Sequence, residues 1–347
     1  MDQFNDYDEL RKVKRSIQFL MVLLGISVVA FIVILNINNF DNNDLNEKLE
    51  SNIIEVNKSN NVETAIQYWT PLDIESINDV NQKELVNYGK ELIIHTSKYL
   101  GPNGIVQKTS NGLNCQNCHL DAGTKVWGNN YGSVASLYPK FRARSGANEN
   151  IYKRVNDCFE RSLNGKSLDT LGKEMQAIKA YIEFLGTNVE KGKKAEGSGF
   201  KDLAYLDRAA DPINGKLVYI AKCQSCHQEN GEGTQLSDGS GYTFPPLWGK
   251  HSYNDGAGLY RISNFAKFVK YNMPLGVSHE SPQLSDEEAW DVAAFVNSQP
   301  RPHIKVPKDW PDKSKKPIDH PFGPYADAFS EKQHKFGPFK PIIETKN

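Results

Sequence analysis

The feature that most constrains this chain is a five-residue pattern, Cys-x-x-Cys-His, which occurs at residues 115–119 and again at 223–227. Two thiols at this spacing can bond the two vinyl groups on one edge of a haem, and the histidine that follows reaches the iron. We therefore predict two covalently bound haem c groups, with attachment at Cys115, Cys118, Cys223 and Cys226 and iron ligation by His119 and His227.

Two other uses of paired cysteines fit this sequence less well. Zinc ribbons place their cysteine pairs about 15–20 residues apart, whereas 105 residues separate Cys118 from Cys223. A thioredoxin-like redox pair needs a βαβ context, and neither motif has one.

The segments around the two motifs are alike, which favours two domains of one kind. A helical segment with a Gly-Lys pair precedes each motif, at Gly89 and at Gly215, where we expect helices to cross. Ser285 and Glu288 form a capping-box pattern at the start of a closing helix. This order resembles class I cytochrome c. The prediction is a mainly α fold with two class I cytochrome c-like domains in tandem, at 67–190 and 212–299, joined by a linker at 191–211 and followed by a Pro-rich C-terminal wrap at 300–347.

The N-terminal sequence indicates where the protein lies relative to the cytoplasmic membrane. An apolar run from Ile17 to Leu35 follows the basic flank 1–16, and nineteen helical residues span about 28 Å, close to a bilayer core. We favour a single transmembrane helix at 17–36 over a cleaved signal peptide, with residues 37–66 as a stalk. The haem domains would then lie on the periplasmic side of the cytoplasmic membrane.

Overall charge excludes one class of partner. The chain has 41 Lys and Arg against 42 Asp and Glu, a net charge of −1. Because nucleic-acid binding needs a basic surface, we expect no nucleic-acid partner.

Each iron needs a second axial ligand or an open position. Met273, in a loop before Pro274, is the expected ligand of the second iron, with His251 and His279 as rivals. Met175 lies on the apolar face of a predicted helix, so we interpret it as a core residue. The first haem therefore lacks an obvious methionine.

Cys158 is the fifth cysteine and the one left over by the two motifs. It follows His119 by 39 residues, a distance suited to a distal thiolate ligand, although a small buried hydrophobe is an equally ordinary use of cysteine. Residues 140–166 carry seven positive and three negative side chains, a local charge of +4. Such a segment attracts small anions, or is simply a solvated helix face.

Several segments resemble the dihaem thiosulfate dehydrogenases, the TsdA family. They are residues 115–123, 138–146, 323–327 and 333–339 and, most specifically, Asn156-Asp157-Cys158-Phe159-Glu160-Arg161-Ser162-Leu163-Asn164-Gly165. The resemblance covers residues 70–345. Relatives without a membrane anchor are common, so the anchor predicted here is a departure that bears on the electron partner.

The resemblance implies a set of ligands and an activity. It implies His119 and Cys158 at the first, catalytic haem, and His227 and Met273 at the second, electron-transfer haem. It implies oxidation of two thiosulfates to tetrathionate, reversible in principle, with an acceptor c-type cytochrome or oxidase. Residues implied at the substrate site are Arg144, Arg161 and Ser162, and we add Arg154 from its charge alone.

Two other functions compete with this one. A membrane-anchored dihaem cytochrome could act only as an electron shuttle to a terminal oxidase, and a dihaem peroxidase would need an opening haem site with an acid–base group. Cys158 within its basic segment argues against both.

Overall fold

A computed structural model of the chain describes residues 4–37 and 67–346. They belong to two units, Met1–Ile66 and Gln67–Asn347. Most of the predicted stalk, from residue 38 to residue 66, lies outside the described residues. Both predicted cytochrome c regions fall in the second unit, which is compact throughout.

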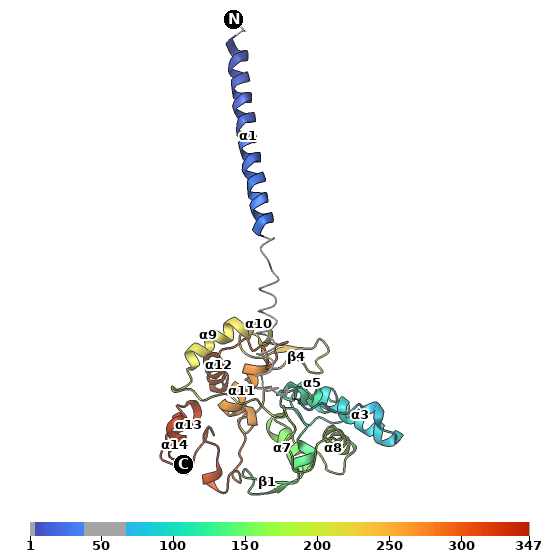
Figure 1. Cartoon of the computed structure of the whole chain (residues 1–347). Coiled ribbons are helices and arrows are strands. Elements are labelled where there is room, and N and C mark those ends of the chain that lie inside the picture. Colours follow the sequence, from blue (N-terminus) through green and yellow to red (C-terminus); the bar gives the residue numbers. More distant parts are fainter. Residues whose placement is uncertain (1–3, 38–66, 347) are drawn as a thin grey trace, which may run out of the picture. The chain divides into compact units, whose positions relative to one another are not determined.

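The first unit contains helix α1, Phe4–Ile37 (Figure 1). The predicted transmembrane segment 17–36 forms its C-terminal part, where apolar side chains such as Leu20 and Met21 are 68% exposed. Among the described residues, however, no helix combines the length and the apolar character needed to cross a membrane. The prediction of a transmembrane helix is therefore not supported by the structure.

The N-terminal half of the second unit is built on two packed helices, α3 and α8. Val86 and Leu92 of α3 are fully buried, as is Met175 of α8, which takes the core position predicted for it. The elements of this half are η1 (Ile74–Ser76), α3 (Val80–Ile94), α4 (Thr96–Leu100), η2 (Cys115–Asn117), α5 (Leu120–Gly123), α6 (Val134–Leu137), β1 (Lys140–Arg142), β2 (Ala147–Glu149), α7 (Ile151–Arg161) and α8 (Lys173–Leu185).

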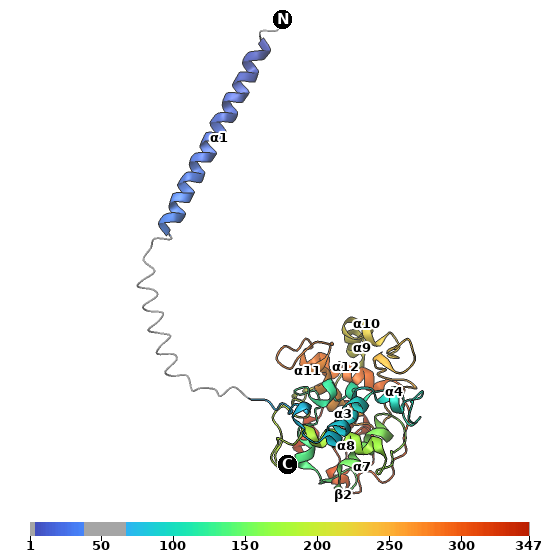
Figure 2. The same ribbon diagram turned by 90° about the vertical axis from the view of Figure 1, so that its right-hand side faces the viewer.

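The C-terminal half repeats this plan with α9 packed on α12 and α11 packed beside them. Ser285 and Glu288 cap α12 reciprocally, so the predicted capping box is confirmed. Figure 1 and Figure 2 show these helices gathered apart from α3, α7 and α8. The elements are α9 (Pro212–Lys222), α10 (Gln224–His227), β3 (Thr234–Gln235), β4 (Tyr242–Phe244), η3 (Gly258–Tyr260), α11 (Ile262–Asn272) and α12 (Asp286–Ser298).

Strands are few and short, so the predicted mainly α class is confirmed. β1 pairs antiparallel with β2, with Lys140 opposite Glu149, and β3 pairs antiparallel with β4. The β1–β2 hairpin leads directly into α7 and so helps to fix where that helix begins.

The proline-rich tail packs on both halves. Phe339 and Ile342 are buried in the core of the C-terminal half, whereas the backbone N–H of Trp310 donates to the carbonyl of Arg144 at 2.7 Å. Its short helices are η4 (Lys313–Lys315), α13 (Glu331–Phe336) and α14 (Lys340–Glu344).

Glycines set both helix crossings, as the Gly-Lys pairs predicted. A Cβ at Gly89 would overlap the carbonyl of Ala177 on α8, and a Cβ at Gly215 would overlap the carbonyl of Asp291 on α12. The absence of a side chain therefore allows each pair of helices to approach closely.

We expect Gly215→Ala to lower the free energy of unfolding by about 2 kcal/mol or more, because the new methyl group must push α9 away from α12. Chemical denaturation of the haem-loaded protein, followed by circular dichroism, measures this. Gly258→Ala is the control, since its Cβ would meet no atom within 4 Å. Equal stability of Gly215→Ala and the wild type would contradict the close crossing.

Candidate active site

The first cysteine motif opens into a cavity of about 350 Å³, which we call the first haem pocket. Apolar residues of α3, α7 and α8 form one wall, including Ile93, Phe159 and Ile178. Residues predicted to bind haem also line the pocket, Cys158 among them, and so does Ser162. Residues that meet there are Cys115, Cys118, His119, Arg154, Cys158 and Ser162.

His119 is held as a neutral imidazole with one nitrogen occupied. Its Nδ1 donates to the carbonyl of Asn129 at 2.5 Å, and its ring stacks on Tyr131 with 4.4 Å between centroids. Burial lowers the pKa of His119 to about 4, and the positive charge of Arg154 acts in the same direction. With Nδ1 so occupied, Nε2 remains for an iron, as the ligand role predicted for His119 requires.

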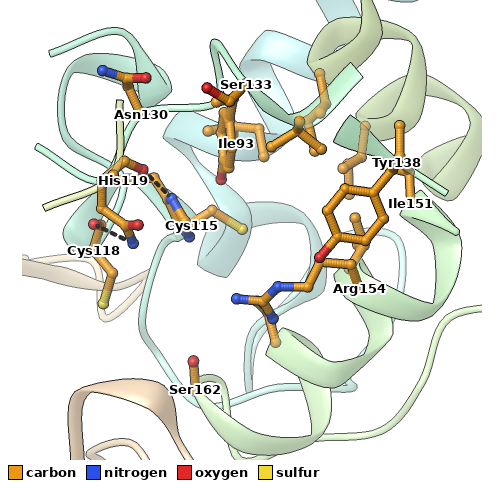
Figure 3. A pocket seen from close by; sticks show the side chains of 18 of the residues that line it. Ile93, Cys115, Cys118, His119, Asn130, Ser133, Tyr138, Ile151, Arg154 and Ser162 are labelled. Carbon is orange, nitrogen blue, oxygen red and sulfur yellow. Dashed lines mark hydrogen bonds between the residues drawn. The ribbon is translucent and has the colours of Figure 1, made fainter. Parts of the chain in front are cut away.

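Helix α7 presents Arg154 and Cys158 on one face, one turn apart. The side chain of Asn150 caps this helix by accepting a hydrogen bond from the backbone of Lys153 at 2.9 Å. The Arg154 Nη1 lies 3.1 Å from the Cys158 sulfur. The proximity of Cys158 raises the pKa of Arg154, against the effect of burial. Figure 3 shows the Arg154 guanidinium reaching into the pocket.

A second cavity of about 450 Å³ adjoins the first haem pocket, and we call it the cationic cavity. It shares Cys118, His119, Arg154 and Cys158 with that pocket. Among its described lining residues one is acidic, Asp157. Seven are basic: Lys140, Arg142, Arg144, Arg154, Arg161, Arg261 and Lys315.

Aspartates pair with some of these cations but not with all. Arg161, whose side chain is 8% exposed, lies 2.9 Å from Asp309, and Arg144 lies 4.0 Å from the same carboxylate. Arg261 donates to Asp319 at 2.8 Å. The N-terminal half supplies three more basic residues to this cavity: Lys140, Arg142 and Arg154. None of them forms an ion pair with another described residue.

Arg144 is affected both by burial and by the neighbouring positive charges. Burial, together with the charges of Arg161 and Arg154, lowers its pKa to about 10. Arg144 still carries its charge at neutral pH, but the neighbouring cations disfavour that charge. An anion in the cavity would relieve the repulsion, so the arrangement is suited to binding one.

The predicted substrate residues all line this site. Arg144, Arg154, Arg161 and Ser162 contribute to the cationic cavity, and Ser162 also follows the last residue of α7. Asp309, Arg261 and Lys315 were not predicted. They lie 100 or more residues beyond α7 in segments without a motif, so no sequence signal connects them to Cys158.

The second motif opens into a cavity of about 300 Å³, the second haem pocket. Cys223, Cys226, His227 and Met273 line it together. His227 Nδ1 donates to the carbonyl of Pro245 at 2.8 Å, and burial lowers the pKa of this histidine. Neither rival ligand, His251 or His279, is among its described lining residues.

Residues of the first motif and the residue before it also form part of the second pocket. Asn114, Gln116, Asn117 and Cys118 line it, and Cys118 lines all three cavities. Each pocket thus pairs two thiols and a histidine with a sulfur-bearing residue, Cys158 or Met273, and apolar walls. These donor sets fit haem c, and the shared wall brings the two pockets close together.

Two family models match the chain. One, described as "Cytochrome c", matches residues 213–300, and one, described as "SoxA/TsdA, cytochrome c domain", matches residues 106–190. Together with the two motifs they define the protein as a dihaem c-type cytochrome with two covalently bound haem c groups.

Comparison with similar proteins identifies one family within this class of cytochromes. A thiosulfate dehydrogenase of Psychrobacter arcticus is 38% identical over 69% of this chain and 71% of its own, and one of Allochromatium vinosum is 39% identical over 62% and 81%. A solved structure of thiosulfate dehydrogenase (TsdBA) from Marichromatium purpuratum has a TM-score of 0.62 and 30% identity over 68% of this chain. Our chain spans half the length of that one. The chain belongs to the thiosulfate dehydrogenase family, and the predicted family and enzyme class are confirmed.

We expect Asp309→Asn to lower the free energy of unfolding by about 1–3 kcal/mol, because the buried guanidinium of Arg161 loses a short carboxylate contact. Denaturation of the haem-loaded protein measures it. The control is Asp202→Asn, whose carboxylate also lies 2.8 Å from a lysine, Lys267, but is 98% exposed. That variant should retain nearly full stability; equal losses in both variants would contradict the argument from burial.

Proposed function

We propose that this protein oxidises thiosulfate and joins two molecules of it into tetrathionate. The observation that carries the proposal is the 3.1 Å contact between Arg154 and the Cys158 sulfur, in a wall common to the first haem pocket and the cationic cavity. A reactive sulfur atom thus faces a space suited to anions.

Charge explains why the reaction needs such a space. Two thiosulfate dianions bring four negative charges together, and their mutual repulsion opposes S–S bond formation. Arginine guanidinium groups offset it and bind sulfonate oxygens through paired N–H donors, as they bind phosphate. Lys140, Arg142 and Arg154 suit this role because they have no ion-pair partner among the described residues. Arg161 is held by Asp309 through Nη2, which leaves its Nε and Nη1 without a hydrogen-bond partner.

We propose that Cys158 forms a transient bond to the sulfane sulfur of the first thiosulfate. The Cys158 thiolate and one thiosulfate give Cys–S–S–SO₃⁻ and two electrons. A second thiosulfate then attacks the sulfane sulfur, forms tetrathionate and releases the Cys158 thiolate. Arg154 would hold the sulfur in place and stabilise its negative charge in both steps.

The proposed iron ligands are His119 and Cys158 in the first pocket and His227 and Met273 in the second. Haem c, when bound, takes up and passes on electrons singly, and methionine ligation raises its potential. The electrons would therefore move from the first pocket to the second and leave to an acceptor c-type cytochrome or oxidase. By microscopic reversibility, the same site can reduce tetrathionate.

The proposed location is outside the cytoplasm, because haem c is attached there. The further proposal of attachment to the cytoplasmic membrane rests on the apolar run from Ile17 to Leu35 in the sequence.

We expect the purified wild type to bleach ferricyanide when thiosulfate is added and to form tetrathionate. Cys158→Gly should slow this at least a hundredfold and change the electron paramagnetic resonance signal of one low-spin ferric haem, because that iron loses its thiolate. Met175→Leu, which removes a buried sulfur outside the haem pockets, is the control. A protein that acts only as an electron shuttle would not bleach ferricyanide with thiosulfate, either as the wild type or as one of the two variants.

The covalent step has its own test. We expect intact-protein mass spectrometry during turnover to detect a thiosulfate-derived adduct, and peptide mapping to locate it on Cys158. Cys158→Gly should carry none. The sample is quenched so that any adduct is trapped before the second thiosulfate attacks. Turnover without an adduct on Cys158 would then contradict this step, while the overall reaction would stand.

A further inference from the structure

Trp310, in the C-terminal tail, has a buried donor without an acceptor. The residue is 7% exposed, it lines the cationic cavity, and its indole Nε1 has no hydrogen-bond partner among the described residues. Buried N–H groups are nearly always paired, because an unpaired one has lost its hydrogen bonds to water. An unpaired N–H beside a cavity therefore indicates a partner that binds there.

The backbone holds Trp310 in an unusual conformation. Its φ of +58° lies in the left-handed region, which is unfavourable for a bulky residue. Several contacts impose it: the backbone N–H donates to the carbonyl of Arg144, the Arg144 guanidinium lies 5.8 Å from the ring centroid, and the His320 ring packs edge-on at 5.6 Å. Strain of this kind persists where surrounding structure fixes a residue for function.

Arg161 also lines this cavity and has two nitrogens without a hydrogen-bond partner among the described residues, although its Nε lies 3.9 Å from the Asp157 carboxylate. Its Nη2 binds Asp309, and the two other nitrogens, Nε and Nη1, are buried. Trp310 and Arg161 together thus offer three N–H groups. A complementary ligand must bring several oxygen acceptors and a negative charge, which describes a sulfonate group.

We infer that Trp310 is a substrate-binding residue, whose indole N–H donates to a sulfonate oxygen of thiosulfate. This inference rests on the proposed function and deepens it. Arg161 binds the same sulfonate group, while the sulfane sulfur of the substrate faces Cys158, which lines the same cavity. The C-terminal tail is therefore part of the active site and selects anions that end in –SO₃⁻.

The chain offers a matched control for this inference. Trp127 also has a positive φ, +56°, and a buried Nε1 without a partner. It is not among the described residues that line the cationic cavity. The two tryptophans thus share their conformation and their unpaired donor and differ in whether they face the cavity.

The experiment compares Trp310→Phe with Trp127→Phe in the haem-loaded protein. We expect Trp310→Phe to raise the KM for thiosulfate about tenfold or more, because a hydrogen bond to a charged oxygen is lost, and to weaken calorimetric binding of sulfate, a non-reducing oxyanion, by a similar factor. Trp127→Phe should leave both quantities within about twofold of the wild type.

A second variant keeps the test valid if Trp310→Phe does not fold. Benzothienylalanine at position 310 keeps the shape of indole and replaces its N–H by sulfur, so it should show the same losses. Unchanged KM and sulfate affinity in either folded variant would overturn the role of Trp310 while thiosulfate oxidation by the wild type stands. Equal losses with Trp127→Phe would also overturn it. If the wild type does not oxidise thiosulfate, while Trp310→Phe weakens sulfate binding and Trp127→Phe does not, the result would contradict the proposed function and support the anion contact.

Discussion

The contact between Arg154 and Cys158 depends on a helix that is fixed at both ends. The Asn150 side chain caps the start of α7. At the other end Asn254, fully buried in the C-terminal half, donates from its side chain to the carbonyl of Glu160 at 2.8 Å and from its backbone to that of Arg161 at 3.1 Å. The halves thus hold one helix jointly. The position of the Cys158 sulfur, and with it the first haem pocket, follows from that.

The cationic cavity is a region of stored electrostatic strain. Burial and, after it, the like charges of Arg161 and Arg154 lower the pKa of Arg144, and the carboxylates of Asp157 and Asp309 compensate only part of the positive charge around Arg161. A protein that needed only stability would replace such a cluster by apolar packing. The cost is understandable if a dianion completes the site, because the ligand then supplies the missing negative charge at the place where the Cys158 sulfur lies.

The predictable part of this molecule is the part encoded locally. Cys115 to His119 fix a haem site by spacing, Ser285 and Glu288 cap a helix within one turn, and Gly89 and Gly215 mark crossings because only a glycine fits there. Asp309, Trp310 and Arg261 reach the site through chain folding over long separations and carry no local pattern, so the sequence alone could not connect them to Cys158. The apolar run at 17–35 predicted a helix correctly, whereas none of the described helices has the length and apolar character needed to cross a membrane.

Three separate segments build the cationic cavity, and this explains why the second unit is one compact body rather than two independent cytochromes. The N-terminal half supplies Cys158 on α7, the C-terminal half supplies Arg261, and the tail supplies Trp310 and Lys315. A simple electron carrier needs only its own haem pocket and gains nothing from such an assembly. A site that must hold two anions beside a reactive sulfur needs walls on several sides. The irregular tail provides one of them, so under the proposed function its packing on both halves serves the active site.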